Sequence, residues 1–278
     1  MRGAELLSRW GLIPEIAPHA FDRHGHYLAG RDEDRLADLN DALRDPGVRA
    51  IFTTRGGKGA YRIADRIDFD AAARDPKPLV GFSDTTILHL ALWHRAHVGS
   101  VHGPHVEWHG PLGRHVADRL RRALMGSTPI VVGRDSRDIT AVVTSAGTAT
   151  GTLMGGNLSL LARAVGWTCP SFAGAILLIE DIDKHIGHVD SALTQLLRSG
   201  VLDGLCGVAI GQFIRCAEPK PGKWSIVDVL RDRLVPLGIP ILGGLPIGHG
   251  PDPHTVPLGA AATLDAAAGT LTVQTGAA

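Results

Sequence analysis

The chain is poor in cysteine, in aromatic side chains and in net charge. Its three cysteines, Cys169, Cys206 and Cys216, lack CxxC spacing, which argues against a disulfide framework or a structural zinc site and fits a reducing compartment. The 28 Lys and Arg residues balance 28 Asp and Glu residues, so the electrostatic footprint of a nucleic-acid or anionic-membrane binder is missing. Charges interrupt the first ten residues, where a signal peptide needs an apolar core, and no apolar run reaches the roughly 20 residues of a membrane span. We therefore expect a soluble, cytoplasmic protein with a small-molecule partner.

Apolar residues and glycine are plentiful instead. Hydrophobic residues make up 44% of the 278 positions, enough for a core in one large or two modest domains. The 35 glycines and 17 prolines are too many for a helical bundle. Strand-like runs at 50–53, 78–82 and 98–101 alternate with helical patterns at 32–44, 60–67 and 83–95, and a further short strand is predicted at 15–17. This alternation predicts an α/β fold with a parallel sheet.

The pattern weakens between about 111 and 148, where a basic helix is followed by a polar stretch. We therefore predict an N-terminal domain at 1–125, a linker at 126–148 and a C-terminal domain at 149–278. In the C-terminal domain, strands at 175–180 and 207–213 alternate with helices near 189–198 and 225–234, and the chain ends in a β-rich segment.

Two strand-to-helix junctions in the N-terminal half carry candidate chemistry. The glycine loop Gly56-Gly57-Lys58-Gly59 follows a strand, where backbone N–H groups can converge on an anion, but it lacks P-loop or dinucleotide spacing and also fits a structural turn. Ser83 lies at the sharp junction Gly81-Phe82-Ser83-Asp84-Thr85. A serine at such a strand-to-helix turn is typical of a nucleophile elbow. The second glycine of the G-x-S-x-G pattern is missing, and Ser-Asp is also an ordinary helix N-cap.

An acidic cluster and an isolated histidine follow strands in the C-terminal half. Glu180 ends the apolar run 176–179 at the carboxyl edge of a predicted sheet, where ligand sites of α/β proteins gather, and either a catalytic or a helix-capping role fits it. His249 lies between Gly248 and Gly250 and is free to approach another segment, although a lone histidine is usually structural.

A group of histidines close together in sequence invites a metal interpretation. These residues lack HExxH spacing and a nearby acid pair, so we expect no metal site from them. The group consists of His94, His97, His102, His105 and His109.

The order of these motifs is more specific than any one of them. It resembles the LD-carboxypeptidase family of serine peptidases, which includes the murein tetrapeptide carboxypeptidases and the microcin C immunity peptidases. The resemblance covers residues 4 to 274, and Lys58 departs from it because the family has an aromatic residue there. The shared segments are Arg55-Gly-Gly-Lys-Gly59, Gly81-Phe-Ser-Asp-Thr-Thr86, His102-Gly-Pro104, Gly155-Gly-Asn-Leu158, Ile179-Glu-Asp181 and Gly248-His-Gly250.

The resemblance implies a Rossmann-like N-terminal domain, a C-terminal domain with a β-rich, barrel-like core, and a catalytic triad assembled across the two. In that triad Ser83 is the nucleophile, His249 the general base and Glu180 the residue that orients the histidine. The implied oxyanion hole consists of the backbone N–H groups of Asp84 and of Gly56 or Gly57. The implied substrate contacts come from Arg55, His102 and Asn157.

The same resemblance implies a homodimer that needs no cofactor and removes a terminal D-amino acid from an L,D-linked peptide, such as the muropeptide tetrapeptide of wall recycling. One alternative is an immunity-type peptidase that hydrolyses aminoacyl-nucleotide amides, with Trp167, Trp224, Lys220 or Lys223 as nucleotide-binding groups. The other is a catalytically silent protein whose glycine loop binds a carboxylate or phosphate.

The start of the chain also departs from the family, which begins further upstream with an apolar strand that ends in a Pro-Ser turn. Here Met1 falls directly before the first predicted helix. That strand is central in such a sheet, and its loss would leave a buried strand unpaired. We therefore expect either that the native protein has an additional N-terminal strand or that it is a truncated form with impaired activity.

Overall fold

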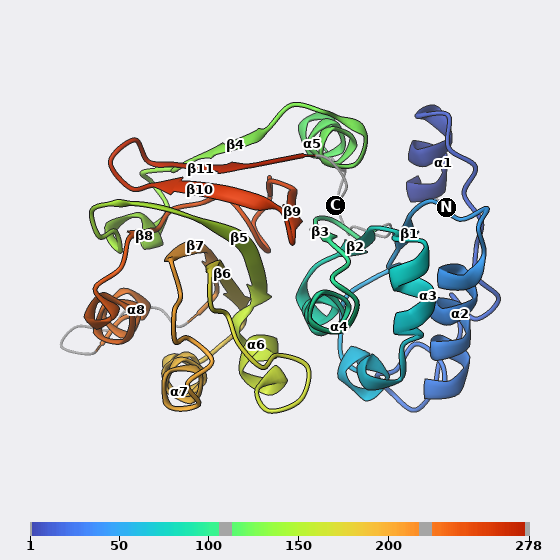
Figure 1. Cartoon of the computed structure of the whole chain (residues 1–278), viewed down its shortest axis with the longest axis horizontal. Coiled ribbons are helices and arrows are strands. Elements are labelled where there is room, and N and C mark those ends of the chain that lie inside the picture. Colours follow the sequence, from blue (N-terminus) through green and yellow to red (C-terminus); the bar gives the residue numbers. More distant parts are fainter. Residues whose placement is uncertain (1, 106–112, 217–223, 276–278) are drawn as a thin grey trace.

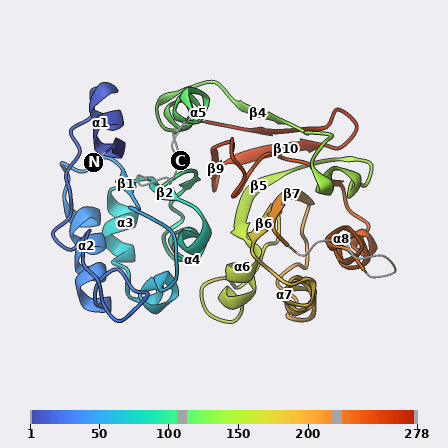
Figure 2. The same cartoon turned by 180° about the vertical axis from the view of Figure 1, so that it is seen from behind.

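The computed structural model describes residues 2–105, 113–216 and 224–275. Figures 1 and 2 show the N-terminal elements, in blue and cyan, on one side of the molecule and most of the green to red elements on the other. The predicted α/β class is confirmed by two sheets, each covered by helices. Among the described residues, no helix combines the length and apolar character that a membrane crossing requires.

The N-terminal sheet has four short strands in the order β1-β2-β3-β9. The first three are parallel, as predicted, and the fourth comes from near the end of the chain and pairs antiparallel with β3. The C-terminal segment thus completes the N-terminal sheet. The strands are β1 (Ile51–Phe52), β2 (Leu79–Gly81), β3 (Ser100–His102) and β9 (Val256–Leu258).

The N-terminal helices follow the predicted periodicity. In α2 (Asp32–Arg44), three acids in the first turn complement the helix dipole, and Leu39 and Leu43 are buried. The predicted stretch 60–67 forms two 3₁₀ turns, η1 (Ala60–Arg62) and η2 (Ala64–Arg66), instead of a continuous helix. The strand predicted at 15–17 is wrong, because these residues pair with no described strand. The remaining helices are α1 (Arg2–Arg9), α3 (Phe69–Arg74), η3 (Ser83–Thr85), α4 (Thr86–Ala96) and α5 (Arg114–Met125).

The C-terminal sheet has seven strands in the order β4-β11-β10-β5-β6-β7-β8. The strands β5 to β8 run parallel to one another, whereas β10, β11 and β4 add an antiparallel extension. The β-rich core expected here is therefore present as an open sheet, with β4 and β8 at its edges. The strands are β4 (Ile130–Gly133), β5 (Thr148–Asn157), β6 (Ala175–Ile182), β7 (Gly207–Ile214), β8 (Ile241–Leu242), β10 (Ala261–Asp265) and β11 (Thr270–Val273).

The parallel part of this sheet is buried on both faces, which explains the continuous apolar run at the start of β6. Its helices lie together below the sheet in Figure 1, and the antiparallel strands lie above it. A capping box formed by Ser225 and Asp228 starts α8. The helices are η4 (Ile139–Val142), α6 (Leu158–Ala164), α7 (Ile186–Arg198), α8 (Ile226–Leu234) and η5 (Val235–Leu237).

The two halves pack directly against each other. Helix α4 contacts β5 and α6, and the backbone N–H of Asn157 donates to Oγ1 of Thr86 over 3.0 Å. Thr86 starts α4, and Asn157 ends β5, so this bond fixes the carboxyl end of a C-terminal strand beside the turn that carries Ser83. The helix α4 lies between the two sheets in Figures 1 and 2.

Candidate active site

Ser83 occupies the turn between β2 and α4, and its backbone has a φ of 59°. A left-handed conformation is costly for a residue with a side chain, and it is common where structure holds a functional group in place. The sharp strand-to-helix junction predicted from the sequence is therefore present. Within the described part of the chain, the Ser83 hydroxyl makes no hydrogen bond, so it is free for a reacting partner.

The glycine loop lies directly beside this serine. A Cβ atom built on Gly56 would be 3.3 Å from Ser83 Cβ and 3.5 Å from Ser83 Oγ. Gly57 has a φ of 133°, a conformation that favours glycine. The loop and the turn, which are separate motifs in the sequence, thus lie next to each other.

Asp84 holds the end of the glycine loop with its side chain. Its Oδ2 atom accepts a hydrogen bond of 2.9 Å from the backbone N–H of Ala60, and the carboxyl group is buried. Burial raises the pKa of Asp84, while the loop N–H groups oppose that rise. Among the described residues, the backbone N–H of Asp84 has no hydrogen-bond partner, so it is available for the oxyanion role implied by the resemblance.

Glu180 and His249 form a short hydrogen bond, 2.5 Å between Oε2 and Nδ1. The glutamate is 0% exposed and the histidine side chain 13% exposed. Burial raises the pKa of Glu180, and the hydrogen bond from His249 acts against that rise. A buried carboxylate on Nδ1 fixes the orientation of the imidazole and leaves Nε2 for chemistry.

The neighbouring acid has the capping role that the sequence left open. Asp181 accepts hydrogen bonds from the backbone N–H and the hydroxyl of Ser159, at the start of α6, and from Nδ2 of Asn157 over 2.9 Å. Adjacent residues in a strand point to opposite faces, so Glu180 serves the histidine while Asp181 serves the helix.

Phe82 connects the serine turn to this acid–histidine pair. Its ring centroid lies 4.7 Å from that of His249, and Phe82 directly precedes Ser83. The structure therefore places the Glu180–His249 pair beside the residue that precedes Ser83, at the junction of the two halves.

A register shift in the sheet shapes the histidine turn. Between β6 and β7, the pairs Ile179 with Ile210 and Asp181 with Phe213 leave an extra residue of β7 opposite Glu180. Gln212 lies in this irregularity, and its Oε1 accepts a hydrogen bond of 2.9 Å from the backbone N–H of Gly250. Such irregularities re-aim side chains next to active sites. No local sequence pattern indicates Gln212, because its partner Gly250 lies 38 residues further along the chain.

The predicted substrate contacts occupy different environments. Arg55 is exposed on the glycine loop, and its Nε donates to the carbonyl of Gly56 over 3.3 Å. His102 is 1% exposed, and burial lowers its pKa to about 3. Asn157 is buried, and its side-chain amide donates a hydrogen bond to Asp181. The substrate roles of all three stay predictions.

The group of five histidines does not form a cluster of potential metal ligands among the described residues. The one such group found there consists of His19, Asp22 and Asp34, in the N-terminal part of the chain. Of the five histidines, His109 lies outside the described residues.

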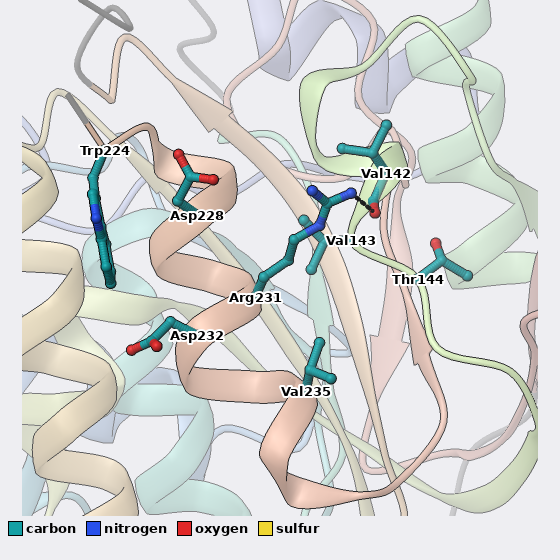
Figure 3. A pocket seen from close by; sticks show the side chains of 8 residues that line it. All are labelled: Val142, Val143, Thr144, Trp224, Asp228, Arg231, Asp232 and Val235. Carbon is teal, nitrogen blue, oxygen red and sulfur yellow. Dashed lines mark hydrogen bonds between the residues drawn. The ribbon is translucent and has the colours of Figure 1, made fainter. Parts of the chain in front are cut away.

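A hollow of about 540 Å³ lies between η4 and α8, away from the serine turn, and Trp224 lines it (Figure 3). It shares no residue with the acid–histidine pair. Trp167 is half-exposed and donates its Nε1–H to the carbonyl of Arg163 over 2.6 Å. Lys220 and Lys223, the other groups considered for nucleotide binding, lie outside the described residues.

The fold and the site define a two-part α/β protein with a buried acid–histidine pair beside a turn serine and a glycine loop, the design of a serine hydrolase. Family models agree with this class: that of the LD-carboxypeptidase N-terminal domain matches residues 1–103, and that of the LD-carboxypeptidase C-terminal domain matches residues 150–264. The chain belongs to the LD-carboxypeptidase family.

Individual relatives match over nearly the whole chain. SCO6489 of Streptomyces coelicolor, which carries a carboxypeptidase name, is 39% identical over 98% of this chain and 87% of its own length. The murein tetrapeptide carboxypeptidase of Pseudomonas aeruginosa is 31% identical, with coverages of 92% and 84%. The crystal structure of muramoyltetrapeptide carboxypeptidase from Oxalobacter formigenes superposes with a TM-score of 0.83 at 28% identity, over 98% of this chain and 92% of that one. The microcin C7 self-immunity protein of Escherichia coli is 24% identical, with coverages of 95% and 84%.

Proposed function

We propose that this protein is a serine carboxypeptidase that removes a terminal D-amino acid from an L,D-linked peptide, the muropeptide tetrapeptide of cell-wall recycling. The observation that carries the proposal is the buried Glu180–His249 hydrogen bond, with the histidine ring against the residue before Ser83. The murein peptidases among its relatives support the substrate class.

In the proposed mechanism, Ser83 Oγ attacks the carbonyl carbon of the scissile bond while His249 Nε2 takes the hydroxyl proton. His249 then gives this proton to the amine of the leaving D-amino acid, and an acyl-enzyme remains on Ser83. Glu180 accepts the Nδ1–H hydrogen bond throughout and stabilises the charged imidazole of the intermediate. Water, activated by His249, releases the shortened peptide from Ser83. The residues of this chain carry the proposed reaction without a cofactor.

The developing oxyanion needs hydrogen-bond donors beside Ser83. The backbone N–H of Asp84, directly after the serine, and that of Gly56 or Gly57 are the proposed donors. The close approach of Gly56 to Ser83, where an added Cβ atom would lie 3.3 Å from Ser83 Cβ, supports this assignment. Each such donor is worth about 3 kcal/mol of transition-state stabilisation.

A pair of tetrapeptides tests the function. We expect turnover of a muropeptide tetrapeptide that ends in D-Ala and none of the isomer that ends in L-Ala, because the L,L carbonyl would miss the oxyanion donors. Release of alanine is measured by chromatography. Preference for the L isomer would refute the proposed specificity.

Two other functions are separated by further reagents. Cleavage of an aminoacyl sulfamoyl adenylate, with neither tetrapeptide cut, would establish the immunity-type activity seen in the name of one relative. A serine-directed fluorophosphonate that fails to label Ser83 would leave the silent binding protein.

Two further parts of the proposal concern the oligomeric state of the protein and its cellular compartment. We propose that the protein acts in the cytoplasm as a homodimer, and both proposals rest on the family resemblance. Light scattering after size exclusion tests the dimer, with twice the monomer mass expected. Cell fractionation tests the location, and recovery in the periplasmic fraction would overturn it.

A further inference from the structure

A second histidine, His105, lies in the site and has no part in the mechanism above. It follows β3 and is 6% exposed. Its Nδ1 atom is 2.7 Å from Oγ1 of Thr53, and the Thr53 hydroxyl is 3.0 Å from the carbonyl oxygen of Val80 in β2. Its ring stacks on Phe82 with centroids 4.7 Å apart and planes 29° apart. The imidazole is therefore held from two sides by the end of the N-terminal sheet.

The free edge of this ring meets the glycine loop. His105 Nε2 is buried without a hydrogen-bond partner among the described residues. A Cβ atom built on Gly56 would lie 2.9 Å from this Nε2 and 3.3 Å from Ser83 Cβ. His105 and Ser83 thus bound the space that a Gly56 side chain would enter, and a Cβ atom there would collide with the histidine ring.

The backbone of Gly56 does not itself demand glycine. Its φ is outside the left-handed region that marks Gly57 and Gly59. Glycine is therefore explained here by its close neighbours: His105 and Ser83 occupy the two sides of the space that a side chain at position 56 would need.

The burial of His105 favours its neutral form. Burial lowers the pKa of this imidazole to about 3. A neutral ring with a fixed edge is suited to holding its neighbours in place.

We propose that His105 is a positioning residue. Its ring keeps the glycine loop close to the Ser83 turn, so that the N–H groups of Gly56 and Gly57 point toward the oxyanion. The inference rests on the proposed function, because it assumes that Ser83 is the nucleophile. If His105 has this role, substitutions at positions 56 and 105 should have non-additive effects on the rate at which Ser83 is acylated.

A double-mutant cycle measures this coupling. The readout is the second-order rate of labelling by a fluorophosphonate, which needs no knowledge of the natural substrate. We expect Gly56→Ala to slow labelling by about 100-fold, because the methyl group displaces the loop and its oxyanion donor. His105→Ala leaves space for that methyl group, so in its background Gly56→Ala should slow labelling by about tenfold or less. Equal effects of Gly56→Ala in the two backgrounds would overturn the proposal.

Thr53→Val provides a second test that leaves the His105 ring in place. Loss of its hydrogen bond to His105 should slow labelling by about fivefold, since one hydrogen bond is worth about 1 kcal/mol. With the tetrapeptide, Thr53→Val should lower kcat and leave KM unchanged, because the oxyanion forms only in the transition state. The exposed His26→Ala variant is the control and should label at the wild-type rate. If His105→Ala does not fold, wild-type labelling by Thr53→Val overturns the proposal.

Failure of the function is distinguishable from failure of this inference. A wild-type protein that labels at Ser83 but cuts no tetrapeptide contradicts the proposed substrate, and the cycle still decides the role of His105. A wild-type protein that neither labels nor cuts contradicts the nucleophile and the positioning role together.

Discussion

Glu180 and His249, 69 residues apart in the sequence, meet through a 2.5 Å hydrogen bond whose carboxylate is completely buried. Burying a carboxylate without a partner costs folding free energy, and the hydrogen bond from His249 offsets part of that cost. The glutamate lies near the end of a parallel strand, and the turn that carries the histidine is bound by Gln212 through the backbone N–H of Gly250. An acid on Nδ1 orients a histidine that carries a proton between a serine and a leaving amine.

Replacement of Ser83 should remove turnover without unfolding the protein. Both Ser83→Ala and Ser83→Gly lose the nucleophile. Because residue 83 has a φ of 59°, Ser83→Gly should be about 1 kcal/mol more stable than Ser83→Ala. Kinetic assays and urea unfolding measure the two effects. Turnover by either variant at the wild-type rate would contradict the serine mechanism.

The other two members of the triad should differ in their effects. His249→Ala should lower kcat about as much as Ser83→Ala, because triad members act as a unit. Glu180→Gln should leave more residual activity, since the amide still occupies the space beside Nδ1. Equal and mild losses at all three positions would point to a different base.

Gly248 is close-packed against the orienting carboxylate. A Cβ atom there would lie 2.8 Å from Glu180 Oε2, and the φ of Gly248 is 126°. Gly248→Ala should therefore displace the acid–histidine pair and lower kcat by about 100-fold. Gly25→Ala is the matched control, because Gly25 also has a positive φ but nothing within 4 Å of the added atom. It should cost stability and leave kcat unchanged, and an equal loss of kcat in both variants would refute the steric explanation.

The carboxylate of Asp84 should stabilise the glycine loop. Asp84→Ala leaves the buried N–H of Ala60 without an acceptor, which we expect to cost about 1 to 3 kcal/mol of unfolding free energy. Asp84→Asn retains an acceptor oxygen and should cost less. Urea unfolding of the two variants provides the measurement. Identical stabilities would show that the Ala60 hydrogen bond contributes nothing.

Three buried histidines predict instability in mild acid. Burial lowers the pKa of His89 to about 4 and those of His102 and His105 to about 3. Between pH 6.5 and about 4 the unfolded chain therefore binds more protons than the folded one, and the unfolding free energy falls as the pH falls. Each histidine contributes about 1.4 kcal/mol per pH unit to this slope.

Urea unfolding from pH 7 to pH 5 tests the slope. His89→Gln, whose amide can replace the hydrogen bond to Gly81, should reduce the slope by about one proton. A slope equal to that of the wild-type protein would mean that His89 is protonated in the folded state.

The sequence by itself determined much of the local structure and, through the family resemblance, the residues of the candidate site. The acidic first turn and leucine spacing at 32–44 predicted α2 with its observed bounds, because helix signals are local. The motif order pointed to Ser83, Glu180 and His249 before any contact between them was known. The strand at 15–17 failed because a strand exists only if another segment pairs with it.

Only the tertiary structure decided which of these residues meet. Whether Glu180 binds a histidine or caps a helix depends on the register of its strand. In the observed register, Asp181 accepts a hydrogen bond from Ser159 and Glu180 accepts one from His249. Three features join segments far apart in the chain. They are the addition of β9 to the N-terminal sheet, the hydrogen bond between Gln212 and Gly250, and the closeness of His105 to the space beside Gly56. Periodicity and turn chemistry describe neighbours along the chain, whereas these contacts follow from how the two sheets pack, so local patterns could not reveal them.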